Sequence, residues 1–427
     1  MPESPLPEEI AASLLALNGL EFQSSTTIQS LWAGYGEICR VVAKPSSSGN
    51  SSTESSRPAS TSNSAISTPQ STSREPQTFI LKLVTPPPTR SGDEGHTRKI
   101  LSYQVEQFFY SHLAPQMPSS LPVAKCLGSV KKHHKDGSSV TATLLSDLRV
   151  QYPVAGEKRD VLSQTQVHAA LDWLSGFHGF WWPRAKDFER SSLVLPPLEE
   201  VQRDGQDATD KTVWLNGGYT YLATRLAEYK RLAGNHRDEW NGALTSVVEG
   251  ENMSIAQIVA AYLAPSRSGT APSAIEEYQT LIHGDVKSEN LFTSTSGSEV
   301  AFYDFQYTGL GLGVCDLAKL FTCSVPLSML VANRNVPHEL EMQPGEQDLL
   351  KRYWARLKET GGREYDWAIF VRHWETALVD WLRFQASWGF WGNTEWLEAR
   401  VRSILSDEEW RRHIISGAQK TGFSGHD

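Results

Sequence analysis

Three oxygen-bearing side chains follow two short apolar runs in this sequence. Asp285 and Asn290 stand five residues apart after the first run, and Asp304 ends the second. Such a set suits phosphoryl transfer, because a base must orient a hydroxyl while an amide and a carboxylate hold the Mg²⁺ that neutralises the transferring phosphate. Polar loops also carry Asp and Asn for turn chemistry alone. The His283-Gly284 pair before Asp285, and the strand-ending position of Asp304, favour the catalytic interpretation.

The complete motif consists of His283, Gly284, Asp285, Asn290, Asp304, Phe305 and Gln306. It resembles the active site of the aminoglycoside phosphotransferase and choline-kinase-like families, and most of all their ecdysteroid-kinase-like (CHK) branch. These are small-molecule kinases with a protein-kinase-like fold. The resemblance implies that Asp285 is the catalytic base and that Asn290 and Asp304 are Mg²⁺ ligands. Lys287 either contacts the transferring phosphate or is an ordinary loop charge.

A second group of residues fits the ATP-binding half of such a fold. Gly34 and Gly36 separate two strand-like runs within residues 28–42, and glycine lets a backbone approach phosphates closely. A plain hairpin turn would explain them equally well without the downstream motif. Ser146 and Leu148 follow the strand-like run 140–145, where the resemblance places backbone contacts to adenine; the family often has Glu at the position of Ser146.

Lys82 lies inside an apolar run, where a buried ammonium is costly unless it is paired. Glu106 lies on the apolar side of a predicted helix over residues 95–113. The two resemble the strand lysine and helix glutamate that fix the α- and β-phosphates of ATP. The alternative is that Lys82 reaches solvent from an edge strand and that Glu106 is a solvated helix charge.

These patterns predict an α+β, bilobal, protein-kinase-like fold. Residues 1–147 form an N-lobe of antiparallel strands and one main helix, residues 148–418 form a larger, mostly helical C-lobe, and 419–427 form a tail. More than half of residues 46–77 are Ser or Thr, with no aromatic residue. Such a segment buries too little surface to order itself, so residues 45–77 are predicted to be a disordered insertion within a hairpin.

The connection after Asp304 indicates the kind of acceptor. Only eleven residues separate Asp304 from Asp316, which is too few for the peptide-docking segment of a protein kinase. Asp316 is expected to cap a helix, and the resemblance adds that it braces the catalytic loop. The glycine-rich residues 309–313 are expected to be a flexible connection. His178, on a predicted helix over 164–180, is expected to be a satisfied core histidine.

Tryptophan recurs every seven residues near the C-terminus, at Trp367, Trp374, Trp381 and Trp388. This spacing puts the four side chains along one helix face, where most would be core. Some could instead line an acceptor pocket, holding a quaternary ammonium by cation–π attraction or a flat sterol by apolar contact. Asp380 could pair with a cationic acceptor or face solvent. These alternatives stay open.

Composition excludes several classes. A net charge of −9 on 427 residues argues against a nucleic-acid partner. The four cysteines lack CxxC spacing, so neither a zinc knuckle nor a disulfide framework is indicated. No apolar run approaches the length of a membrane span. We expect a cytoplasmic monomer or small homo-oligomer.

The sequence thus predicts an ATP- and Mg²⁺-dependent kinase that phosphorylates a hydroxyl of a small molecule of the choline, aminoglycoside or sterol kind. The alternatives are a catalytically inactive kinase-like binding protein and, less favoured, a protein kinase.

Overall fold

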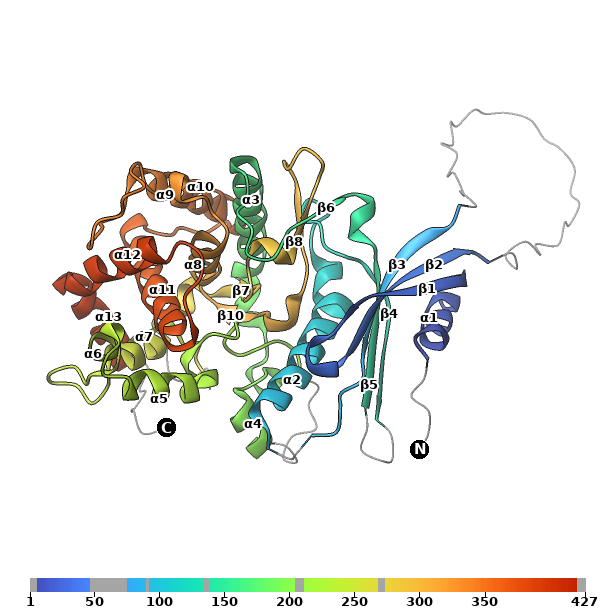
Figure 1. Cartoon of the computed structure of the whole chain (residues 1–427), viewed down its shortest axis with the longest axis horizontal. Helices are drawn as coiled ribbons and strands as arrows, with labels where there is room; N and C mark the ends of the chain where they lie inside the picture. Colours follow the sequence, from blue (N-terminus) through green and yellow to red (C-terminus); the bar gives the residue numbers. More distant parts are fainter. Residues whose placement is uncertain are drawn as a thin grey trace, which may run out of the picture. The chain divides into compact units, whose positions relative to one another are not determined.

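The computed structural model describes residues 6–46, 75–89, 92–133, 139–203, 211–267 and 273–420 (Figure 1). Their contacts divide the chain into two compact units. The first comprises Met1–Pro88 with Ala124–Asp147, and the second comprises Thr89–Val123 with Leu148–Asp427.

The first unit is built on a five-stranded antiparallel sheet in the order β1-β2-β3-β5-β4. Its strands are β1 (Leu20–Ser30), β2 (Gly36–Pro45), β3 (Gln77–Val84), β4 (Cys126–His133) and β5 (Ser139–Ser146). β2 and β3 pair with Gly36 opposite Val84 and Ala43 opposite Gln77, which confirms the predicted hairpin. Most of the predicted Ser/Thr-rich insertion lies outside the described residues.

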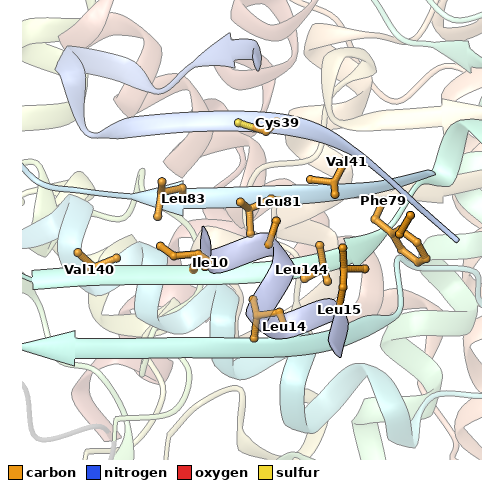
Figure 2. Packing of buried hydrophobic residues seen from close by; sticks show 13 residues of the cluster. Ile10, Leu14, Leu15, Cys39, Val41, Phe79, Leu81, Leu83, Val140 and Leu144 are labelled. Atoms are coloured by element: carbon orange, nitrogen blue, oxygen red, sulfur yellow. The ribbon is translucent and has the colours of Figure 1, made fainter. Parts of the chain in front are cut away.

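One face of this sheet is covered by α1 (Pro7–Ala16), whose apolar side chains interlock with alternate strand residues (Figure 2). Leu14 and Leu15 of α1 meet Phe79, Leu81 and Leu83 of β3, all nearly excluded from solvent. Because strand side chains alternate between faces, Lys82 lies on the opposite face from this core.

The second unit is mostly helical and contains two small sheets. Strands β6 (Val154–Ala155), β8 (Leu291–Thr293) and β9 (Val300–Phe302) form one, and β7 (Thr280–Ile282) with β10 (Gly309–Gly311) forms the other. The longer helices are α2 (Glu94–Phe108), α3 (Gln164–Trp181), α8 (Gly313–Cys323), α10 (Pro344–Gly361), α11 (Trp367–Trp388), α12 (Thr394–Ser406) and α13 (Glu408–Lys420). The shorter ones are α4 (Pro197–Arg203), α5 (Leu226–Gly234), α6 (Glu239–Thr245), α7 (Ile255–Leu263) and α9 (Leu327–Leu330).

Helix α2 differs from its predicted place. The sequence assigns it to the N-lobe, but its contacts group it with the second unit. It packs against α4 and against the 3-10 turn Phe305–Tyr307, and it continues into a π-helical turn, Phe109–Leu113, whose Phe109 ring stacks on Phe305 at 3.7 Å. Residues about 200 positions later in the chain therefore hold this helix, which local sequence patterns do not reveal.

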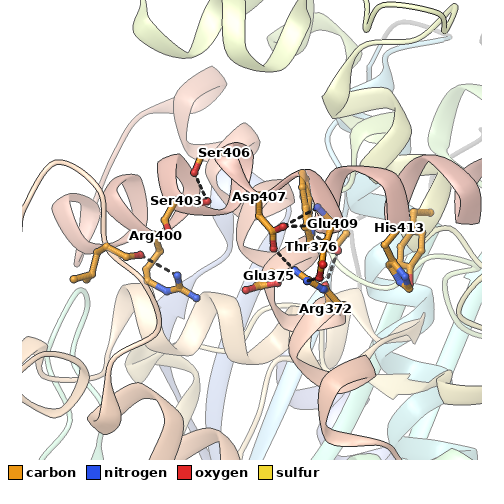
Figure 3. A network of polar contacts seen from close by, with 12 residues as sticks. Arg372, Glu375, Thr376, Arg400, Ser403, Ser406, Asp407, Glu409 and His413 are labelled. Atoms are coloured by element: carbon orange, nitrogen blue, oxygen red, sulfur yellow. Dashed lines mark hydrogen bonds and ion pairs between the residues drawn. The ribbon is translucent and has the colours of Figure 1, made fainter.

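Helix α11 contacts α5, α7, α8 and α12 within the second unit. It is joined to α13 by Arg372, which pairs with Asp407 just before α13 and with Glu409 in its first turn (Figure 3). Arg372 also pairs with Glu375 one turn along α11 at 3.1 Å. Within the described residues, no helix has the length and apolar character needed to cross a membrane.

Candidate functional site

The loop that carries Asp285, residues 283–290, leaves β7 and turns sharply at Gly284. Gly284 has φ +86°, and a Cβ there would lie 2.2 Å from the carbonyl oxygen of Tyr307, so only glycine fits. The loop then folds back on itself. The side-chain amide of Asn290 donates to the backbone carbonyl of Asp285 at 2.8 Å and to its Oδ2 at 2.9 Å. Asn290 Oδ1 is therefore the atom left to bind a cation.

His283 joins this Asp285 loop to the strand that precedes Asp304. Its ring is fully buried; Nδ1 accepts from the backbone N–H of Asp285 at 3.2 Å, and Nε2 lies 2.9 Å from the carbonyl oxygen of Tyr303. Because Nδ1 accepts, Nε2 carries the proton and donates. Burial lowers the pKa of His283 below its ordinary value despite the nearby carboxylates of Asp316 and Asp285, so the ring is a neutral linker at physiological pH.

Asp304 has a left-handed backbone, with φ 66° and ψ 57°. A residue with a side chain rarely adopts this conformation, and such positions cluster at functional sites. Gln306 Nε2 holds Asp304 Oδ1 at 2.7 Å, and the N–H of Tyr303 donates to the carbonyl of Asn290 at 3.0 Å. The pairing of β8 with β9 thus brings Asp285, Asn290 and Asp304 into one neighbourhood.

Lys287 is mostly buried and faces two carboxylates. Its ammonium lies 3.2 Å from Asp285 Oδ2 and 3.0 Å from Glu289 Oε1. Burial by itself would lower the pKa of Lys287, but these carboxylates, Asp285 first, raise it above its ordinary value. The ammonium is therefore charged beside Asp285, and its contact with the transferring phosphate stays a prediction. Sequence reasoning missed Glu289, because only the fold turns it toward Lys287.

Helix α8 supports the Asp285 loop through Asp316. The fully buried carboxylate accepts from the backbone N–H groups of His283 at 2.7 Å and Gly284 at 2.9 Å. Asp316 Oδ2 also lies 3.2 Å from His178 Nε2. The other ring nitrogen of His178, Nδ1, lies 2.7 Å from the Tyr353 hydroxyl. The predicted core position of His178 is confirmed.

The capping interpretation of Asp316 is wrong. Helix α8 begins at Gly313, and Asp316 points out of its first turn to the loop. Burial raises the pKa of Asp316, but His178 and Lys319 outweigh it, and the net pKa is lowered, so the group is a carboxylate.

The predicted flexible connection over residues 309–313 is also wrong. Gly309–Gly311 form β10, which pairs with β7. A Cβ on Gly309 would lie 2.4 Å from the carbonyl oxygen of Trp214, and one on Gly313 would lie 2.1 Å from the Tyr353 hydroxyl. The glycines are there because other chain segments approach closely.

Glu106 lies in the second unit, and its side chain is buried, with 6% of its surface exposed. It neighbours the fully buried Tyr110. Burial first, and then the charges of Glu106 and Asp304, raise the pKa of the Tyr110 phenol well above its ordinary value. Glu106 therefore lies in the same electrostatic neighbourhood as Asp304.

The remaining predicted residues are distributed over both units. Lys82 is half-buried in β3, opposite Ile38 and Thr143. Gly34 closes the turn before β2. Gly36 has φ +132°, and a Cβ there would lie only 2.1 Å from the Leu83 carbonyl oxygen, so close strand pairing already requires this glycine.

The two residues predicted to contact adenine lie on either side of the boundary between the units. The Ser146 hydroxyl accepts from the N–H of Lys125 at 2.9 Å. Leu148 begins a 3-10 turn in the second unit. Their nucleotide contacts, and the pairing of Lys82 with Glu106, stay predictions.

The donor set near Asp285 matches magnesium better than zinc or iron. Asn290 and Asp304 supply one amide and one carboxylate oxygen, and Mg²⁺ is commonly held by one or two such groups together with waters and phosphates. Among the described residues, no cluster of three His, Cys, Asp or Glu side chains could form an all-protein metal cage. The residues therefore fit a metal that arrives with a nucleotide.

Comparison with known proteins assigns the chain to a family. The model of the ecdysteroid kinase-like family matches residues 63–360. The chain belongs to this family. That assignment puts it among small-molecule phosphotransferases that act on alcohols. No curated protein matches the sequence.

Solved structures similar to this ecdysteroid kinase-like chain include an aminoglycoside-3'-phosphotransferase of type VIII, with a TM-score of 0.37 and 13% identity over 90% of this chain and 100% of that one. An ethanolamine kinase from Plasmodium vivax has a TM-score of 0.36 and 11% identity, with coverage of 93% and 85%. A choline kinase from Streptococcus pneumoniae has a TM-score of 0.35 and 13% identity, with coverage of 96% and 97%. Membership of the family rests on the sequence match.

The second unit of this kinase-like chain contains a cavity of about 770 Å³, within the range of small-molecule sites. Its wall passes directly behind the Asp285 loop, since Ile282 and Lys319 both line it. The other side is formed by α7 and α11 and is largely apolar, with residues such as Ala261, Leu263 and Trp381.

The tryptophans of α11 have different surroundings: one is a core residue, and another lines the cavity. Trp374 is completely buried and donates to Glu346 at 2.8 Å, so it is core. Trp381 lines the cavity, and Trp388 is more than half exposed at the end of the helix. Asp380 also lines the cavity, but it pairs with Arg383 at 2.7 Å rather than facing solvent.

Proposed function

We propose that this chain transfers the γ-phosphate of ATP, bound with Mg²⁺, to a hydroxyl of an uncharged, largely apolar small molecule. The observation that carries the proposal is the position of the cavity. Its lining residues Ile282 and Lys319 contact or precede the loop in which Asn290 and Lys287 surround Asp285. A hydroxyl at that end of the cavity would be within reach of a carboxylate already oriented by its neighbours.

In the proposed reaction, Asp285 orients the acceptor hydroxyl, whose oxygen forms the new bond to the γ-phosphorus. The bond from phosphorus to the bridging oxygen breaks, ADP leaves, and the hydroxyl proton passes to Asp285. Asn290 and Asp304 would hold Mg²⁺, which supplies neutralising charge for the phosphates when it is bound. Lys287 keeps a positive charge beside Asp285.

ATP would be held by the residues that the sequence assigned to it. Lys82, oriented by Glu106, would bind the α- and β-phosphates, while the backbone around Gly34 and Gly36 covers them. Backbone groups at Ser146 and Leu148 would pair with adenine. These roles follow from the family resemblance.

The charge pairing in the cavity favours an uncharged acceptor over choline or an aminoglycoside. Two carboxylates occur among the described lining residues. Asp380 pairs with Arg383, and Glu199 forms two contacts with Arg267, at 2.6 and 3.0 Å. The Asp380–Arg383 pair is largely buried, so a cationic acceptor that separated it would leave a buried charge without its partner, which is costly. The Glu199–Arg267 pair is more exposed to solvent, so it weighs less in this argument.

The test is phosphate transfer from radiolabelled ATP to a panel of choline, ethanolamine, kanamycin, cholesterol and ecdysone. We expect labelling of a neutral sterol alcohol and none of choline. Asp285→Ala should abolish turnover while leaving ATP affinity within about twofold, because that side chain meets the hydroxyl rather than the nucleotide. Asp348→Ala, an exposed carboxylate on α10, is the matched control. Unchanged turnover in Asp285→Ala would refute the assignment of the base, and ATP binding without any turnover would indicate a binding protein.

A further inference from the structure

Lys319 is a buried cation in the wall of the cavity, and the proposed reaction gives it no chemical role. It lies on α8, three residues after Asp316, and only 5% of its surface is exposed. Its side chain lines the cavity, and its ammonium donates to the carbonyl oxygen of Gly284 at 2.5 Å. Gly284 is the residue directly before Asp285, so this ammonium joins the wall of the cavity to the loop that carries the proposed base.

The space around the ammonium is made by two neighbouring residues. A Cβ on Gly218 would lie 2.9 Å from Lys319 Nζ, so a larger residue there would displace it. The ring of Tyr219 lies beneath the charge, with 5.7 Å from Nζ to the ring centre. The fold therefore encloses a positive charge next to the cavity at this point.

The ammonium of Lys319 has more hydrogen-bond donors than its contact with Gly284 uses. An ammonium has three donors, and a buried charge is costly unless its donors are used. Among the described residues, Gly284 supplies the one hydrogen bond to it. The nearby carboxylate of Asp316 is already engaged by two backbone N–H groups and by His178. Donors thus remain for an oxygen in the cavity.

We propose that Lys319 binds the acceptor alcohol, donating a hydrogen bond to an oxygen at the end of the cavity next to Asp285. The ligand class is a neutral alcohol whose apolar body fills the cavity and whose hydroxyl oxygen meets the ammonium. One lysine then holds both the acceptor and the Gly284 peptide, which fixes the hydroxyl relative to Asp285. This inference rests on the proposed function for the site, but acceptor binding can be measured without turnover.

The test is equilibrium binding of the fluorescent sterol dehydroergosterol to the full-length protein, together with binding of a non-hydrolysable ATP analogue. The variants are Lys319→Met, which keeps an unbranched chain one heavy atom shorter and removes the charge, and Lys319→Arg, which keeps the charge. Lys351→Met, an exposed lysine on α10, is the control. We expect Lys319→Met to weaken sterol binding at least tenfold, Lys319→Arg to weaken it less, and neither to change binding of the ATP analogue more than twofold.

Three outcomes would overturn the inference: no sterol binding by the wild-type protein, equal sterol affinity in Lys319→Met, or an equal loss of sterol and nucleotide binding, which would reduce Lys319 to a brace for the loop. Should Lys319→Met fail to fold, Lys319→Gln, which also removes the charge, decides by the same criteria. Sterol binding that depends on Lys319, without phosphate transfer, would refute the proposed function but support this inference.

Discussion

Asp316→Asn tests how the Asp285 loop is held in place. Asparagine has the same shape as aspartate, so the change creates no cavity, but it removes the charge and replaces one acceptor oxygen with an NH₂ donor. The wild-type carboxylate accepts from His283 N–H through Oδ2 and from Gly284 N–H through Oδ1. Whichever way the new amide turns, one of these two buried N–H groups faces another donor.

The magnitude follows from the burial of the group, which is completely excluded from solvent. A buried N–H left without an acceptor costs about 1 to 3 kcal/mol, and the remaining bond loses its charge assistance, worth about 1 kcal/mol. We expect the free energy of unfolding of the second unit to fall by about 2 to 4 kcal/mol. Displacement of Asp285 should also lower kcat on the order of 10²-fold.

The assay combines urea unfolding followed by tryptophan fluorescence with kcat and KM for ATP. Asp348→Asn, at an exposed position on α10, controls for the loss of one negative charge. Asp316→Asn with the unfolding midpoint and kcat of wild type would refute the reasoning. A loss of stability with unchanged kcat would show that the loop keeps its position without this carboxylate.

Two further predictions concern buried charges. Lys287→Met should lower kcat about 10- to 100-fold with little change in KM for ATP, because Asp285 and Glu289 lose the ammonium between them; wild-type kinetics would make Lys287 an ordinary loop charge. His373 is buried, which lowers its pKa to about 3. The native state therefore binds a proton at His373 only at a lower pH than the unfolded chain does. Stability should therefore fall by up to about 1.4 kcal/mol per pH unit as pH drops below about 6.5, and His373→Asn should flatten that fall in urea titrations, whereas the exposed His236→Asn should not.

The sequence by itself determined the elements with strong local signals. The apolar run around Lys82 and the helical spacing over residues 164–180 depend only on neighbours in the chain, so β3 and α3 were predictable. The pairing of β2 with β3 was predictable because a long insertion between paired strands costs little entropy. The Asp285–Asn290 spacing was readable because one short loop contains it.

Tertiary structure decided everything that depends on distant residues. Whether Asp316 caps its own helix or holds another loop depends on where α8 packs. The glycines within residues 309–313 are required because the Trp214 carbonyl and the Tyr353 hydroxyl approach the backbone there. Likewise, a period of seven placed four tryptophans on one helix, but only the packing of α11 against α7 and α8 separated the buried Trp374 from the cavity-lining Trp381. Lys319 carried no sequence signal at all, because a lysine within a helix is ordinarily solvated. Its contact with Gly284, 35 residues earlier in the chain, exists only once the chain has folded.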